Sequence, residues 1–183
     1  MAEVFADWRD VFIAGAGAAA VLLGLVFVAG SIRQGSTPAA GERTPGWRHL
    51  LLNRFEFATE AEALATQTYV MFIYAFAFAL VMLMPFASTI PPAVLLVAIG
   101  GLGLAETALP FMRMIRSTPR PTLFEQAWRY WLPTGAMLAV VGGGLAILEG
   151  NAAGIEVVAV GGALLLFGAV RNAWDLYLLN PGR

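Results

Sequence analysis

Long apolar runs separated by short polar segments are the dominant pattern of this chain. Its charged residues gather at the N-terminus, within 33–62, within 113–129 and near the C-terminus. The runs between these clusters reach the length of about 20 apolar residues that a helix needs to cross a bilayer. We therefore predict an all-α integral membrane bundle in which residues 1–183 form a single membrane domain. The five predicted spans are 10–32, 64–86, 92–113, 130–149 and 155–179.

The distribution of arginine predicts the orientation of the spans. The connections after the first and third spans carry four arginines each, whereas the short turns "ASTIPP" and "EGNAAG" carry none. Basic loops stay on the cytoplasmic side of a membrane. We therefore expect the N-terminus outside and the C-terminus in the cytoplasm. The arginines are Arg33, Arg43, Arg48 and Arg54 in the first connection, and Arg113, Arg116, Arg120 and Arg129 in the second.

Aromatic residues mark the predicted membrane interface. Trp128 and Trp131 begin the fourth span and Trp174 ends the fifth, as expected for interfacial anchors. Residues 47–62 start with Trp47 and place apolar side chains at helical spacing. This segment is either an amphipathic helix lying on the interface or an extension of the second span out of the membrane.

Composition excludes several classes of protein. Of 183 residues, 59% are hydrophobic and 13% are charged, whereas soluble domains have about a quarter of their residues charged. The absence of cysteine excludes disulfides and thiolate metal sites. A net charge of −1 gives no basic surface for nucleic acid. The single histidine, His49, cannot supply bis-histidine haem ligation, and no hydrolase motif is present. We expect no enzymatic activity, no cofactor and no metal.

Small residues recur at a spacing of four in several spans, which lets helix backbones approach closely in a membrane. These rows indicate either packing within a five-helix bundle or, most clearly on the first span, a contact with a second copy or another membrane protein. The rows are Ala16, Ala20 and Gly24 in the first span, and Gly135, Ala139 and Gly143 in the fourth.

A weak internal similarity suggests a duplicated hairpin. "VAIGGLGL" at 97–104 resembles "VAVGGALL" at 158–165, an offset of 61 residues. Parallel repeats occur in membrane proteins. Chance is the alternative, because valine, alanine and glycine are common in such helices.

Three ionisable residues lie deep in the predicted spans. A charge in the bilayer is expensive, so it is usually paired or faces a cavity. Glu106 lies seven residues before Arg113 and Arg171 lies nine residues before Asn180, so both are roughly 10–14 Å from the inner side at 1.5 Å per residue. Asp175 lies one helical turn after Arg171. The first hypothesis is therefore a buried cluster of Glu106, Arg171 and Asp175 that fixes two spans against each other.

Pro110 suggests a second hypothesis for Glu106. Proline lacks the N–H group that would bond to the carbonyl of residue 106. A kinked turn there would leave both the carbonyl and the carboxylate of Glu106 available to an ion or a proton. This hypothesis describes a conduction or sensing site.

Two segments carry a resemblance to known proteins. "FADWRDVFIAGAGAAAVLLGLVFVAGSI" at 5–32 and "VRNAWDLYLL" at 170–179 resemble small uncharacterised bacterial multipass membrane proteins, some of which are labelled modulator of FtsH protease. The resemblance implies a bacterial inner-membrane location and a membrane protease as partner. It implies no functional residue.

From these patterns we predict a non-enzymatic subunit, scaffold or regulator of a membrane complex that acts through helix–helix contacts. Its partners would be the lipid bilayer and either further copies or other membrane proteins. The alternative is a small oligomeric channel or transporter with an intramembrane Glu/Arg site.

Overall fold

The computed structural model describes residues 2–34, 60–86, 88–116 and 127–178. Five of its helices are long and apolar enough to cross a membrane, which confirms the expectation of five apolar helices. Each predicted span overlaps one of them, whereas residues 47–59 of the expected interfacial helix lie outside the described residues. The elements are α1 (Ala2–Gln34), α3 (Glu60–Leu83), α4 (Ile90–Arg116), η1 (Ala127–Trp131), α6 (Leu132–Leu148) and α7 (Ala153–Leu178).

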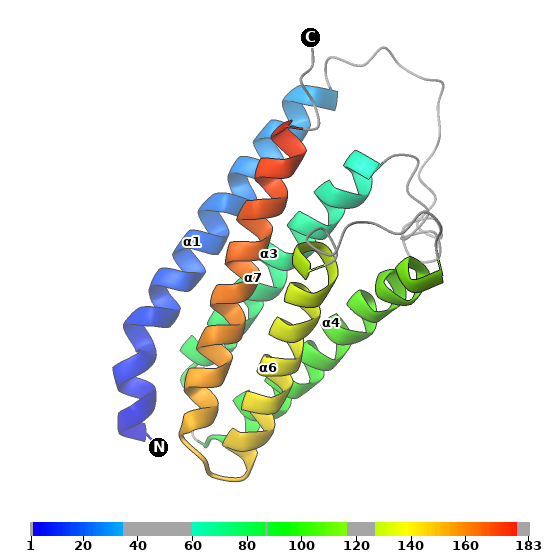
Figure 1. Ribbon diagram of the computed structural model, residues 1–183. Coiled ribbons are helices and arrows are strands. Elements are labelled where there is room, and N and C mark those ends of the chain that lie inside the picture. The colour runs from blue at the N-terminus through cyan, green and yellow to red at the C-terminus, as the bar shows by residue number, and fades with distance from the viewer. Residues whose placement is uncertain (1, 35–59, 87, 117–126, 179–183) are drawn as a thin grey trace, which may run out of the picture.

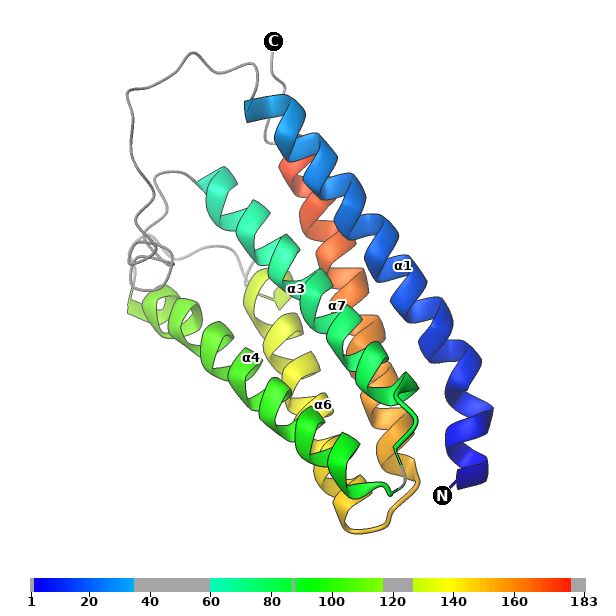
Figure 2. The same ribbon diagram turned by 180° about the vertical axis from the view of Figure 1, so that it is seen from behind.

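The helices run alternately up and down the bundle. In Figure 1 the beginning of α1, the α3–α4 turn and the α6–α7 turn lie at the lower end. The ends of α1, α4 and α7 lie at the upper end, together with the beginnings of α3 and η1. The view from behind in Figure 2 shows the same order, with α1 and α4 on opposite edges.

Two helical hairpins form the body of the bundle. Helix α3 packs along α7, and α4 packs along α6, so each hairpin contacts the other through both of its helices. Helices α6 and α7 also pack along each other, whereas α3 and α4 touch only sparsely. Helix α1 is added at one edge, mainly against α3. Gly100 and Gly161 share the offset of 61 and both approach Val140. The duplication itself stays a prediction.

The α6–α7 turn ends one helix and begins the next through local sequence. Gly150 takes a positive φ of 81°, which glycine adopts without steric cost. The Gly150 N–H bonds to the Ile147 carbonyl and the Asn151 N–H bonds to the Ala146 carbonyl, which is the Schellman pattern. The Asn151 side chain then accepts a hydrogen bond from the Ala153 N–H and caps α7. These bonds hold α6 and α7 in a tight hairpin.

Apolar side chains are both the core and much of the surface. Buried side chains such as Phe72, Phe78 and Leu165 fill the interior, while Phe27 and Phe167 are more than half exposed. A soluble domain hides most large apolar groups, whereas a bilayer solvates them. The exposed apolar faces are compatible with a multipass membrane protein.

Candidate functional site

Glu106 on α4 is held by a tyrosine of α3. The Tyr74 hydroxyl donates a hydrogen bond of 3.0 Å to Oε2 of the Glu106 carboxylate. Tyr74 is 7% exposed and its ring packs against Phe78, so the donor is fixed in place. The bond joins two helices that otherwise touch sparsely. Glu106 is half-buried, so its carboxylate remains partly accessible at the site where the helices are joined.

Gly103 brings a third helix to the same place. A methyl group added at Gly103 would lie 2.6 Å from the Met137 sulfur of α6 and 3.2 Å from Cε1 of Tyr74. The Met137 and Tyr74 side chains occupy the space beside residue 103, so they reach the α4 backbone here because residue 103 has no side chain. The space beside Glu106 is therefore closely packed by Tyr74, Gly103 and Met137.

Thr134 adds a buried hydroxyl at the level of Glu106. Gly100 faces Val141 and Gly103 faces Met137, so α4 and α6 run antiparallel in a regular register. One turn further along, this register places Thr134 opposite Glu106. The Thr134 Oγ1 atom is buried and has no hydrogen-bond partner among the described residues. A buried hydroxyl without a partner is costly, so Thr134 is a polar group that the apolar packing around it does not explain.

A second side-chain hydrogen bond joins α3 to η1, at the start of the predicted fourth span. Residues Ala127–Trp131 form a π-helix, a wide turn that often occurs at functional sites. Pro133 has no N–H group, so it cannot donate to the carbonyl four residues earlier, at Arg129. Gln67 Nε2 of α3 donates to the Arg129 carbonyl instead. Gln67 thus replaces the hydrogen bond that Pro133 removes and fixes η1 to α3.

The expected three-residue charge cluster is not formed as one unit. Arg171 and Asp175 pair within α7 at 3.2 Å, with both side chains partly exposed. Glu106 is bonded to Tyr74, and α4 packs on α6 and α3 rather than along α7. Equal depth in the membrane predicted that Glu106 and Arg171 could meet. Depth alone does not determine which helices are neighbours, and here α6 is the main neighbour of both α4 and α7.

Asn172 is a buried polar residue of the α3–α7 interface. It is 1% exposed, and its Nδ2 group donates a weak hydrogen bond of 3.7 Å to the Met71 sulfur. Its Oδ1 atom has no partner among the described residues. Thr68, which is fully buried on α3, lies about one turn from Met71. Polar groups therefore line the upper part of this interface as well.

Helix α4 continues as a helix through Pro110 to Arg116. The chain is therefore not unwound at the proline, and the expected kink at Pro110 stays a prediction. The Pro110 side chain lies outside the part of the structure described in atomic detail.

The small-residue rows divide between inner and outer faces. Gly143 is buried at the α6–α7 contact and Ala139 is half-buried near Gly161, whereas Gly135 is exposed. On α1, Ala16 is buried, but Ala20 and Gly24 are exposed. A spacing of four advances around a helix by about 40° a step beyond a full turn, so a row drifts off the packed face.

The aromatic anchors lie where α6 begins and α7 ends. Trp131 and Trp174 are 60% and 58% exposed. Trp131 is the last residue of η1 and Trp174 lies near the end of α7, and Figure 1 shows the start of η1 and the end of α7 at the upper end of the bundle. The side chain of Trp128 and the whole of Trp47 lie outside the described residues. Their role as interface anchors stays a prediction.

Sequence reasoning missed the uncharged members of the site. Only ionisable residues were counted in the spans, so Tyr74, Gln67, Thr134 and Asn172 were passed over. The signal was present, because each is a polar residue inside an otherwise apolar run. Weighing every buried hydrogen-bonding group, rather than only charges, would have selected them.

No family model matches this chain, and neither the curated proteins nor the solved structures compared with it contain a match.

Proposed function

We propose that this chain is a non-enzymatic multipass protein of the bacterial cytoplasmic membrane. It acts as a subunit, scaffold or regulator of a membrane complex through helix–helix contacts. The five apolar helices of alternating direction support this proposal. The two arginine-rich connections join elements at the same end of the bundle, so both lie on the cytoplasmic side when the N-terminus is outside. The resemblance in sequence makes a membrane protease one candidate partner.

The main support for this proposal is the exposed outer face of α1. Only 17% of the α1 span is buried within the chain, against 28–50% for the other four spans. Its inner face, with Phe12, Ala16 and Ala19, is buried against the bundle. On the opposite face Gly17 and Gly24 have no atom within 4 Å of the position that a Cβ would take.

A transmembrane helix of another membrane protein is the occupant that fits this face. Gly17, Ala20 and Gly24 fall on one side of α1 and form a shallow strip in which a second backbone can lie close. Val21 and Val28 of α1 are exposed as well, and Gly135 and Gly142 of α6 are also exposed, so it is the low buried share of the α1 span that singles out its face. Close backbone approach at small residues is the main source of helix association in lipid.

The experiment compares Gly24→Leu with Gly142→Leu. Both glycines are exposed and have open space around the Cβ position, but Gly142 lies on α6. The tagged chains are purified in mild detergent and the copurifying proteins are quantified by mass spectrometry. We expect Gly24→Leu to lower recovery of the partner about tenfold, as for the loss of about 1.4 kcal/mol of association energy. Gly142→Leu should leave it unchanged.

Recovery of every copurifying protein at parental levels with Gly24→Leu would contradict the proposal. The melting temperature of the isolated chain serves as the folding control, because at both glycines the Cβ position has no neighbour within 4 Å. A change confined to the mass of the chain's own oligomer would identify a second copy as the partner.

The bond between Tyr74 and Glu106 favours a second candidate, a conduction or sensing site. A half-buried carboxylate held by a hydroxyl, with the Thr134 hydroxyl on the facing helix, has the chemistry to accept a proton or a small cation. Intramembrane carboxylates commonly mark such pathways.

Proton flux into liposomes containing the purified chain tests this second function. Glu106→Gln keeps the shape of the side chain but removes its charge, so it should abolish any flux that the parent supports. Glu156→Gln is the matched control, because Glu156 is exposed at the first turn of α7. Equal flux in Glu106→Gln and the parent would exclude conduction through this carboxylate.

A further inference from the structure

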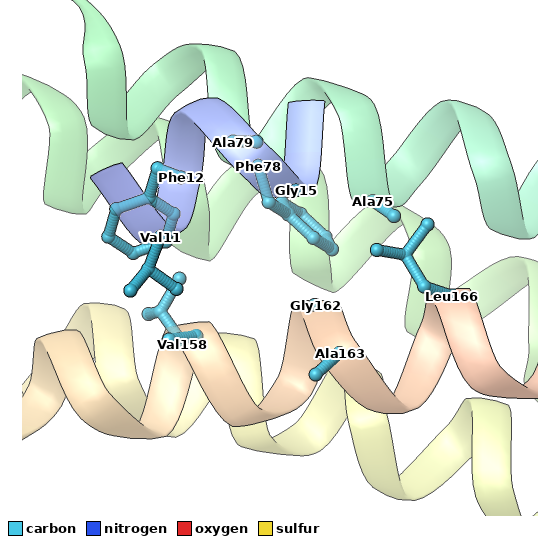
Figure 3. A pocket seen from close by; sticks show the side chains of 11 residues that line it. Val11, Phe12, Gly15, Ala75, Phe78, Ala79, Val158, Gly162, Ala163 and Leu166 are labelled. Carbon is cyan, nitrogen blue, oxygen red and sulfur yellow. The ribbon is translucent and has the colours of Figure 1, made fainter. Parts of the chain in front are cut away.

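A cavity of about 80 Å³ lies between α1, α3 and α7 (Figure 3). Every residue that lines it is apolar. Phe12 of α1 and Phe78 of α3 form one side, and Gly162, Ala163 and Leu166 of α7 form another. The cavity is partly open to the exterior, and its lining includes the exposed residues Val11 and Ala163. It is distinct from the polar site at Glu106.

The cavity exists because two facing helices lack side chains there. Gly15 of α1 and Gly162 of α7 both line it, and neither has an atom within 4 Å of its Cβ position. Helix α1 packs mainly on α3 and only lightly on α7, so the α1–α7 side stays unfilled. An unfilled space between helices loses the dispersion contacts of its lining atoms. A molecule that enters restores those contacts.

The position of the cavity indicates which molecule can enter. It begins one residue after the exposed Asp10 on α1 and two residues after the exposed Glu156 on α7, the acids that mark the polar end of these helices. Cavities with apolar walls exclude water and accept hydrocarbon, as an enclosed one of about 150 Å³ does for benzene. This cavity has about half that volume and is partly open, so it holds a few methylene groups of a longer chain. In a bilayer, the hydrocarbon at this depth is the part of a lipid chain nearest its headgroup.

We propose that this cavity binds one acyl chain of a membrane phospholipid. The inference rests on the membrane insertion proposed above, but not on the partner of α1. The chain enters between α1 and α7 beside Val11 and packs against Phe12, Phe78 and Leu166. The lipid completes the contact between α1 and α7 that the side chains leave open.

Gly162→Leu tests the proposal because it fills the cavity from within. The Cβ position at Gly162 is open, so the leucine side chain takes the space of the acyl chain without displacing the backbone. Gly142→Leu is the control, since it adds the same side chain to an exposed position on α6. Gly15→Val fills the same cavity from α1 and replaces Gly162→Leu if that variant fails to fold.

The chain is reconstituted with phospholipid that carries a photoreactive diazirine in its acyl chain, and adducts are mapped by mass spectrometry. We expect adducts in the peptides containing Val11–Gly15 and Val158–Leu166. Gly162→Leu should lower them about tenfold, because several methylene groups lose their binding site. Gly142→Leu should leave them at parental levels.

Equal adduct yields at these peptides in Gly162→Leu and the parent would overturn the acyl-chain site. If adducts at other lipid-facing positions such as Leu102 persist in that case, membrane insertion stands and only the site fails. A complete absence of adducts would overturn insertion and the site together. The copurification experiment with Gly24→Leu is independent of this one, so its result does not depend on whether lipid adducts form.

Discussion

The two hairpins of the bundle are held together in different ways. In α6–α7 the backbones touch, because a methyl group at Gly143 would lie 2.7 Å from the Gly154 carbonyl oxygen. In α3–α4 the helices touch sparsely, and the Tyr74–Glu106 bond joins them. Small residues therefore make one hairpin tight, and a polar contact bridges the other. Where the two helices of a hairpin do not approach closely, as in α3–α4, a polar side-chain contact joins them instead.

The largest expected effect comes from adding one methyl group to the tight hairpin. Gly143→Ala forces the α6 and α7 backbones apart and should destabilise the fold by about 2 kcal/mol, a typical cost of overpacking. Gly142→Ala, one residue earlier, has open space and should instead stabilise by about 0.5–1 kcal/mol through helix propensity. Reversible unfolding in mixed detergent measures both. Effects of the same sign would show that the backbones do not touch at Gly143.

Removal of the Tyr74 hydroxyl tests the contact that joins α3 to α4. Tyr74→Phe should cost about 1 kcal/mol, because buried hydrogen bonds between membrane helices contribute about that much. The exposed Tyr69 on the same helix is the matched control, and Tyr69→Phe should have little effect. A double-mutant cycle with Glu106→Leu isolates the pair, because leucine cannot accept the hydrogen bond. A coupling energy near zero would mean that the bond does not join α3 to α4.

The Gln67 bond to η1 predicts a rescue. Gln67→Leu removes the hydrogen bond that Gln67 donates to the Arg129 carbonyl and should cost about 1 kcal/mol. In a Pro133→Ala background residue 133 regains an N–H group four residues after Arg129, so the same change should cost less than half as much. The test compares the unfolding free energies of the parent, Gln67→Leu, Pro133→Ala and the double variant. An equal cost in both backgrounds would mean that Gln67 does not substitute for the missing N–H.

The smallest effect is expected at the ion pair of α7. Arg171 and Asp175 are partly exposed and one turn apart, so Arg171→Ala should cost only about 0.5 kcal/mol. The Tyr74→Phe variant, measured beside it, should be the less stable of the two. A loss of several kcal/mol in Arg171→Ala would restore the hypothesis that this arginine clasps two spans.

Helix length and apolar character could be predicted from sequence because they are properties of single segments. The five runs and the turn "EGNAAG" are local, and the Gly150 φ and the Asn151 cap follow from residue types. Which helices pack against each other could not be predicted in the same way. Whether Glu106 meets Arg171 or Tyr74 depends on which helices pack together, and depth along each span carries no such information.

The outward face of α1 shows the same limit. Its glycines and alanines predicted close packing, but sequence left open whether the packing was internal. The structure divides them, with Ala16 inside and Gly24 outside. Only the three-dimensional arrangement identifies which small residues remain for a partner.

Crosslinking from that face in native membranes tests the central claim most directly. A photoreactive amino acid placed at Ala20 is compared with one at Leu138, an exposed residue of α6. We expect a discrete protein adduct from Ala20, lost in Gly24→Leu, and no protein adduct from Leu138. Absence of any protein adduct at Ala20 in folded, membrane-inserted chain would contradict the claim that this protein acts through helix contacts of α1.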